Sequence, residues 1–133
     1  MKLLLDTCCL LWALQDVHRL SPTALRALKD PENTLSVSVL SFWEISIKAS
    51  LGKLGLQGRV PEDFPKIVED AGWSILPLDP IVVASSGRLP RIAHHRDPFD
   101  RLLVWQAICG DFALLSRDNA MSIYSPHDLK VCW

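Results

Sequence analysis

The sequence lacks any apolar run long enough to cross a membrane. A spanning helix needs about 20 consecutive apolar residues, and no such run occurs among the 133 residues. Asp6 interrupts the apolar residues near the N-terminus, and no small-residue cleavage site follows the apolar stretch that ends at Leu14. These features exclude the pattern of a secretory signal peptide. We therefore expect a soluble, cytoplasmic protein with no membrane partner.

The sequence also has little net charge and few cysteines. A formal charge of −1 provides no overall field for nucleic acid, so an anionic partner must be held by a local basic patch or by a metal. The four cysteines form no C-x-x-C pair and have no histidine at zinc-ligand spacing. We expect three or four of them to be small buried side chains. A reactive thiol at Cys8 or Cys9 stays open, because a helix N-terminus lowers the pKa of a thiol.

What the sequence does have is enough apolar content for one domain over residues 1–133. Hydrophobic residues make up 49% of the chain, and at this length a fold buries about two-thirds of its surface without disulfides or structural metals. The composition excludes disordered, collagen-like and disulfide-scaffold chains. The sequence shows no internal repeat and no low-complexity segment.

Segments typical of strands alternate with segments typical of helices. Strands are predicted at 3–5, 34–38, 73–78 and 112–115, with a further edge strand at 131–133. Helices are predicted at 7–14, 22–29, 41–52, 61–71, 80–87 and 98–109. This alternation indicates an α/β domain with a mainly parallel central sheet of four to five strands and helices on both faces.

Four acidic residues lie where predicted strands give way to helices, or in the first turn of a helix. They are Asp6, Glu44, Asp100 and Asp118. In an open parallel sheet, ligands bind beyond the carboxyl ends of the strands, so these side chains are candidates for one shared site. Each also has a structural explanation. Asp6, Asp118 and the nearby Asp97 are typical helix N-caps, and Glu44 follows Ser41 at the spacing of an S-x-x-E capping box.

Taken together, the four acids also fit a metal site. Carboxylates that converge with no interleaved Lys or Arg repel one another unless protons or cations neutralise them. Their hard oxygen atoms select Mg²⁺ or Mn²⁺. Such an ion lowers the pKa of a water molecule and orients a phosphodiester. The pattern therefore supports two hypotheses equally, a metal-dependent phosphodiesterase or a set of unrelated helix caps.

Four motifs occur in order along nearly the whole chain. They are L-L-L-D-T at 3–7, F-W-E-I-S-I-K at 42–48 leading into L-G-K-L at 51–54, H-R-D-P-F-D-R-L-L at 95–103, and L-S-R-D at 115–118. Together they resemble the PIN domain and, more narrowly, VapC-type ribonuclease toxins of prokaryotic toxin–antitoxin modules. The resemblance implies a three-layer α/β/α PIN-like domain and a metal-dependent endoribonuclease that cleaves RNA phosphodiesters.

The same resemblance implies roles for the acids. Asp6 and Asp100 match the principal ligands of Mg²⁺ or Mn²⁺, and Asp118 matches a ligand of a second ion or one that binds through water. Glu44 matches either a ligand or an acid just outside the ligand sphere. Asp97 is the alternative to Asp100, since a one-turn slip exchanges them. We favour Asp100 because Asp97 has the more complete capping explanation.

Further polar residues are expected around this site. Small polar positions of the family, which orient metal-bound waters, are matched by Thr7, Ser116 and Asn119. Basic candidates for contacts with RNA phosphates are Lys48, Arg88, Arg91, Arg96 and Arg101. Two of these have another explanation, since Lys48 follows Glu44, and Arg101 follows Asp97, at the spacing of a helical ion pair. The four histidines include no obvious general base.

The resemblance also implies partners, namely an RNA substrate, a second copy in a homodimer, and a cognate antitoxin that wraps over the early helices and covers the acidic site. The chain departs from the family at Trp105, where a small residue is usual, and Trp12 and Trp43 are also bulky. A side chain of this size in the site would change substrate access. The alternative function is a catalytically degenerate PIN-fold binding module, and the presence of all four acids argues against it.

Overall fold

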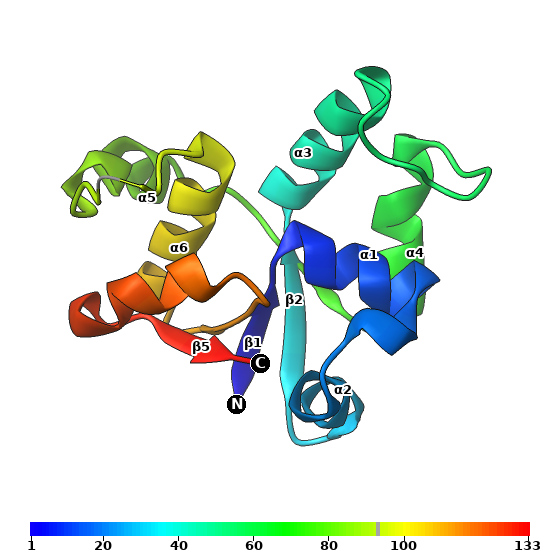
Figure 1. Cartoon of the computed structure of the whole chain (residues 1–133), viewed down its shortest axis with the longest axis horizontal. Coiled ribbons are helices and arrows are strands. Elements are labelled where there is room, and N and C mark those ends of the chain that lie inside the picture. The colour runs from blue at the N-terminus through cyan, green and yellow to red at the C-terminus, as the bar shows by residue number, and fades with distance from the viewer. Residues whose placement is uncertain (93) are drawn as a thin grey trace.

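The computed structural model describes residues 1–92 and 94–133 and contains a five-stranded sheet (Figure 1). The strands are β1 (Lys2–Leu5), β2 (Thr34–Ser38), β3 (Ser74–Leu76), β4 (Ala113–Leu115) and β5 (Lys130–Cys132). Their order is β3-β2-β1-β4-β5, and every pair is parallel. The predicted parallel sheet is therefore confirmed, with β1 at its centre.

Helices connect the strands. The α-helices are α1 (Thr7–Gln15), α2 (Pro22–Lys29), α3 (Val39–Ser50), α4 (Phe64–Asp70), α5 (Pro80–Ser85) and α6 (Pro98–Gly110). Short 3₁₀ helices are η1 (Val17–Arg19), η2 (Pro61–Asp63), η3 (Ser86–Arg88) and η4 (Asn119–His127). Within the described residues no helix is both long and apolar enough to cross a membrane.

The alternation of side chains along β1 produces a core on each face of the sheet. Leu3 and Leu5 are fully buried in one core with residues of α1, α2 and α4. Leu4 points the other way, into a second core that α6 and η4 cover. Successive strand side chains alternate between faces, so the continuous apolar run of β1 fits a strand buried on both sides. The three-layer α/β/α prediction is confirmed (Figure 1).

The predicted start of α3 is wrong. Ser41 does not cap this helix, which begins two residues earlier, at Val39, with Ser38 as its N-cap. The Ser38 hydroxyl accepts the N–H of Leu40 at 3.1 Å and donates to Gln106 Oε1 at 2.6 Å. Ser38 is therefore both the last residue of β2 and the N-cap of α3. The capping-box pattern at residues 41–44 led to the wrong prediction.

Other predictions differ from the structure at element boundaries. The strand predicted at 73–78 is shorter and ends at Leu76, because Pro77 has no N–H to continue the ladder. The helix predicted at 61–71 begins as η2 and becomes regular only at Phe64. Helix η4 was not predicted, since it contains Pro126 and lacks an extended apolar period. Residue 93 of the predicted loop at 89–96 lies outside the described residues.

The expectation for the cysteines is also wrong. Only Cys9 is buried, whereas Cys8 and Cys109 are exposed and Cys132 is intermediate. Desolvation and then the charge of Asp6 raise the pKa of the Cys8 thiol to about 11, and the same two causes raise that of Cys9. The carboxylate beside these thiols outweighs the helix N-terminus, so neither thiol is activated as a nucleophile.

Candidate metal centre

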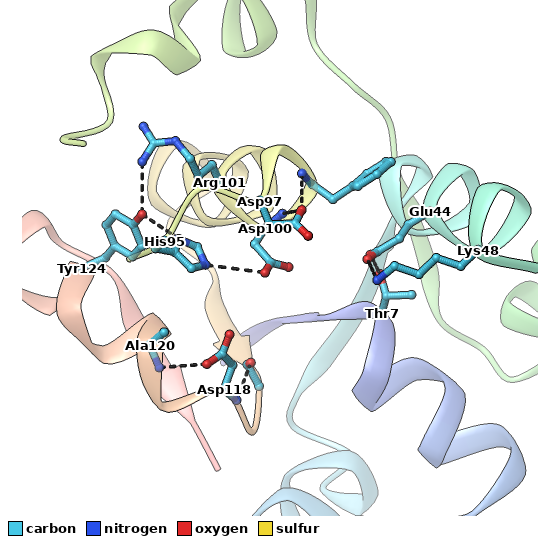
Figure 2. Close-up of polar contacts among 12 residues, drawn as sticks. Thr7, Glu44, Lys48, His95, Asp97, Asp100, Arg101, Asp118, Ala120 and Tyr124 are labelled. Atoms are coloured by element: carbon cyan, nitrogen blue, oxygen red, sulfur yellow. Dashed lines mark hydrogen bonds and ion pairs between the residues drawn. The ribbon is translucent and has the colours of Figure 1, made fainter. Parts of the chain in front are cut away.

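The fold brings the predicted acids to one edge of the sheet. Asp6 and Asp118 follow β1 and β4, which are neighbours in the sheet, and Glu44 lies in α3, directly after β2. Asp100 lies in the first turn of α6. Figure 2 shows the carboxylates of Glu44, Asp100 and Asp118 facing a common space. Parallel pairing is the physical reason for this convergence, because the carboxyl ends of all the strands meet at the same edge.

The electrostatics of Asp100 reflect this crowding. Desolvation first, and then the charges of the neighbouring acids Asp97, Glu44, Asp118 and Asp6 in that order, raise the pKa of its carboxyl to about 7. The pKa of Asp6 is also raised, by burial first, although the Ser116 hydroxyl and the backbone of Cys9 act in the opposite direction. A cluster that cannot carry all of its negative charge unaided favours protons or a cation.

Helix capping and a place in the cluster turn out to be compatible. Asp6 Oδ1 accepts the N–H of Cys9 at 2.7 Å, and Asp118 Oδ1 accepts that of Ala120 at 2.9 Å. In both residues the cap uses Oδ1, and a carboxylate has a second oxygen for another partner. Helix capping by Asp6 and Asp118 is therefore confirmed, and it does not use the oxygen that the predicted metal would need.

Asp97 and Asp100 differ in what their side chains do. Asp97 Oδ1 accepts the N–H of Phe99 at 2.8 Å and that of Asp100 at 3.3 Å, so it caps α6. The Asp100 carboxylate caps nothing and instead turns toward Asp118 (Figure 2). Among the described residues, one group of three offers metal-ligand atoms within 4.8 Å of one another, and it consists of His95, Asp100 and Asp118.

Glu44 is fixed by two donors on the other side of this space. The Thr7 hydroxyl donates to Glu44 Oε1 at 2.5 Å, and Lys48 Nζ donates to Glu44 Oε2 as an ion pair (Figure 2). Ser41 Oγ lies 3.1 Å from the Thr7 hydroxyl. Desolvation lowers the pKa of Lys48, but the hydrogen bond and charge of Glu44 outweigh it and leave that pKa raised. The helical ion pair predicted between Glu44 and Lys48 is confirmed.

His95 is the residue that sequence reasoning missed. Its side chain is 5% exposed, and its Nε2 lies 3.5 Å from Asp100 Oδ2 (Figure 2). Its Nδ1 lies 2.7 Å from the hydroxyl of Tyr124, in η4. Desolvation lowers the pKa of the imidazole. The signal available in the sequence is the spacing of His95 and Asp100 within the H-R-D-P-F-D motif, which brings both side chains to the start of α6.

Arg101 does not pair with Asp97, contrary to the expected helical ion pair. Its guanidinium donates to Leu89 O at 2.9 Å, to Pro90 O at 3.1 Å and to the Tyr124 hydroxyl at 3.2 Å. Arg101 therefore fastens the segment before α6 to η4, and this use of the guanidinium leaves little of it for RNA.

The remaining predicted residues lie around the same edge. Ser116 is buried and its hydroxyl accepts the N–H of Asp118 at 3.1 Å, while Asn119 begins η4. A pocket of about 780 Å³ is lined in part by Arg91, His95, Arg96 and Arg101. Arg88 borders a separate, more open pocket beside α5. The chain therefore has a basic pocket directly beside the acidic cluster.

The tryptophans that depart from the family pattern do not occupy this space. Trp105 turns toward α5, where its Nε1 donates to Ser85 Oγ at 3.1 Å, and Trp12 lies against Trp133 with ring centroids 6.1 Å apart. Trp43 is 59% exposed and contacts the Phe99 ring edge-to-face, with centroids 5.0 Å apart. Of the three, only Trp43 is available to an incoming partner beside the acids.

The PIN domain family model matches residues 3–125 of the chain. The chain is a PIN-domain protein. Since the match spans nearly the whole sequence, the resemblance carried by the four motifs is confirmed at the level of the family. No match is found among curated proteins.

Solved structures share the fold of this PIN domain over almost their full length. VapBC2 from Rickettsia felis, bound to a DNA fragment from its promoter, has a TM-score of 0.63 and 14% identity, with 98% of this chain and 97% of that chain covered. VapBC-1 from nontypeable Haemophilus influenzae has a TM-score of 0.66 and 16% identity, with coverages of 98% and 96%. FitAcB from Neisseria gonorrhoeae has a TM-score of 0.56 and 19% identity, with coverages of 97% and 95%. These likenesses show the fold alone.

The donor set of the PIN domain fits a divalent cation. Its carboxylates are hard oxygen ligands of the kind that Mg²⁺ and Mn²⁺ prefer. The raised pKa of Asp100 shows that its negative charge is poorly compensated within the protein. The buried Nε2 of His95 has no hydrogen-bond partner and points at the same carboxylate. A cation between these groups would satisfy both.

Proposed function

We propose that this PIN domain is a Mg²⁺- or Mn²⁺-dependent endoribonuclease and the toxin of a toxin–antitoxin module. The observation that carries the proposal is the convergence of Asp6, Glu44, Asp100 and Asp118, with the charges of the other three all raising the pKa of Asp100. The presence of every acid favours catalysis over a degenerate binding module. The shared fold with the VapBC and FitAcB structures supports the toxin assignment.

In the proposed reaction, the acids hold the metal and the neighbouring residues hold the acids. Asp6, Asp100 and Asp118 would be the ligands, and the ion supplies an activated water and stabilises charge on the phosphate. Glu44, with its charge balanced by Lys48 and its position fixed by Thr7, faces the same space from α3. The caps of α1 and η4 fix the positions of Asp6 and Asp118, and the Ser116 hydroxyl accepts the N–H of Asp118. These contacts would keep both carboxylates facing Asp100.

The basic pocket is the proposed contact for the RNA backbone. Arg91 and Arg96 are exposed and line it, whereas Lys48 is occupied by Glu44 and Arg101 by backbone carbonyls. The pocket shares His95 with the edge of the acidic cluster, so a strand bound there would pass the carboxylates. Arg91 and Arg96 are therefore better candidates for phosphate contacts than Lys48 and Arg101.

Arg91→Ala is expected to weaken RNA binding several-fold and to make it less sensitive to salt. Each phosphate contact to a single strand contributes about 0.7 to the slope of log affinity against log salt concentration, so the slope falls by about that amount. Fluorescence anisotropy with an RNA oligonucleotide at several salt concentrations measures it. Arg26→Ala, in α2, is the matched control and leaves the slope unchanged. An unaltered slope in Arg91→Ala would remove this residue from the interface.

Partners are proposed from the resemblance and the shared fold. We infer a cognate antitoxin that covers the acidic site, and a homodimer of the toxin. The complexes in the solved structures support the first inference. Large apolar side chains exposed near the early helices, Trp43 and Leu51, and on α5, Ile81, offer surfaces of the kind that partner proteins bury.

Metal-dependent cleavage of RNA is the direct test of this function. The purified protein, stripped of metal, is expected to cleave RNA only after Mg²⁺ or Mn²⁺ is added, and a chelator is expected to stop the reaction. Cleavage is followed by gel electrophoresis of an end-labelled transcript. Cleavage that continues at full rate in excess chelator would contradict the proposal, as would the absence of cleavage across a broad panel of cellular RNAs.

A further inference from the structure

His95 belongs to the side of the acidic cluster formed by Asp100 and Asp118, although the family resemblance assigns only carboxylates there. The ligand atoms of these three residues lie within 4.8 Å of one another. His95 is 5% exposed, and its Nε2 is one of only two buried side-chain polar atoms, in the part of the chain that the structure describes, without a hydrogen-bond partner. A buried polar atom left unpaired is costly, so its direction toward two carboxylates needs an explanation.

The separation between His95 and Asp100 is informative. Nε2 lies 3.5 Å from Asp100 Oδ2, which is longer than the roughly 2.7–3.2 Å of an N–H···O hydrogen bond. Two adjacent ligands of an octahedral ion, each about 2.1 Å from the metal, lie about 3 Å apart, and two opposite ligands lie about 4.2 Å apart. The observed separation falls between these values. It is too long for a direct hydrogen bond and short enough for one ion to reach both atoms.

The ring is held in this orientation by residues that lie outside the acidic cluster. The Tyr124 hydroxyl lies 2.7 Å from Nδ1, and the Tyr124 ring packs edge-to-face on the imidazole with centroids 5.2 Å apart. Arg101 donates to the same hydroxyl and to two backbone carbonyls. With Nδ1 engaged, Nε2 is the nitrogen presented to the acids. For Nε2 to bind a metal, Nδ1 must carry the proton and donate it to the Tyr124 hydroxyl, which is how a metal-ligating histidine typically uses its other ring N–H.

We infer that His95 binds the divalent cation through Nε2, which makes the centre a mixed site of one nitrogen and carboxylate oxygens. The inference rests on the proposed function, since it assigns one more ligand to the same ion. Imidazole suits transition metals, whereas Mg²⁺ prefers oxygen ligands. His95 therefore shifts the preference of the centre toward Mn²⁺ and away from Mg²⁺.

Pulsed electron–nuclear double resonance on the Mn²⁺-loaded protein tests whether His95 is a metal ligand, without relying on activity. Protein grown with ¹⁵N-histidine is compared with unlabelled protein, and we expect a coupling of the size of a directly bonded nitrogen that changes with the isotope. The coupling is expected to disappear in His95→Gln and to persist in His94→Gln, the exposed neighbour that serves as the matched control. Competition between the two ions should show that His95→Gln lowers the Mn²⁺/Mg²⁺ affinity ratio by about tenfold.

A second variant covers the case in which His95→Gln does not fold. His18, His94 and His127 are all exposed, so a variant with these three changed to Gln keeps His95 alone, and the coupling must persist in it. If Mn²⁺ binds the wild type but shows no bonded-nitrogen coupling, His95 is not a ligand while the proposed function stands. If no Mn²⁺ binds the wild type at all, the proposed function fails together with this inference.

Discussion

Asp100→Asn is expected to lower the rate of metal-dependent RNA cleavage by about 10³-fold or more. The substitution keeps the size of the side chain and removes the charge at the centre of the acidic cluster. Charge stabilisation by a bound metal contributes several kcal/mol to catalysis, and each 1.4 kcal/mol or so corresponds to about tenfold in rate. The measurement is the initial rate of cleavage of an end-labelled RNA at saturating Mn²⁺, followed by growth of cells that express each variant.

Asp97→Asn is the matched control for this prediction. Asparagine caps helices as well as aspartate does, so the variant keeps the hydrogen bonds that start α6 and loses only a neighbouring charge. We expect its cleavage rate to stay within about tenfold of the wild type, since one unit of differential pKa interaction corresponds to about 1.4 kcal/mol. If Asp97→Asn is inactive and Asp100→Asn is active, the ligand is Asp97. If both variants, and Asp6→Asn, retain full activity, the acids are not the catalytic centre.

Asp100→Asn is also expected to stabilise the metal-free protein, by about 2 kcal/mol at pH 8. Desolvation and then the surrounding acids raise the pKa of Asp100 to about 7 in the folded protein, against its ordinary 3.8. The folded state therefore binds this proton more tightly than the unfolded state. The free energy of unfolding consequently falls as the pH rises from about 4 to about 7. The full difference is about 4 kcal/mol, and solvent screening of a carboxylate that is 31% exposed reduces it to about half.

Urea unfolding in the presence of a chelator measures this effect. The free energies of unfolding of wild type and Asp100→Asn should agree near pH 4 and diverge in favour of the variant as the pH approaches 8. Asp70→Asn, which removes an exposed acid at the end of α4, should show no such divergence. Added Mn²⁺ should reverse the order, because it binds the folded wild type and adds stability by mass action. A wild type that is as stable as the variant at pH 8 without metal would contradict the prediction.

Much of the fold could be predicted because local patterns determine it. The unbroken apolar run of β1 predicts a strand buried on both faces, and this is how Leu3, Leu4 and Leu5 are used. The closeness of Asp6 and Asp118 follows from parallel pairing, and the helices that follow β2 and precede β4 bring Glu44 and Asp100 to the same edge. The start of α3 was predicted wrongly because two overlapping capping patterns occur there, and only tertiary contacts decide between them. Ser38 caps the helix while hydrogen-bonding Gln106, 68 residues away.

The part of the site that could not be predicted depends on contacts distant in sequence. His95 is oriented by Tyr124, 29 residues further along the chain, in a 3₁₀ helix with no periodic signal. Arg101 has the spacing of an ion pair with Asp97, yet carbonyls of a preceding loop take its guanidinium. The sequence alone does not indicate which side chains will contact a single histidine in the folded protein. The acids became candidates because they lie at strand ends and near helix starts, whereas Tyr124, which orients His95, lies in a segment with no recognisable pattern.

The basic pocket and the acidic cluster have one residue in common, His95. His95 and Arg101 line the pocket, while His95 also approaches Asp100 and Arg101 holds the tyrosine that orients it. A ligand that fills the pocket would therefore contact the His95 imidazole, which is also the proposed ligand of the ion. Two ligands that both contact His95 would be thermodynamically linked, and linkage is reciprocal. RNA that engages Arg91 and Arg96 would alter the affinity for metal by the same factor by which metal alters the affinity for RNA.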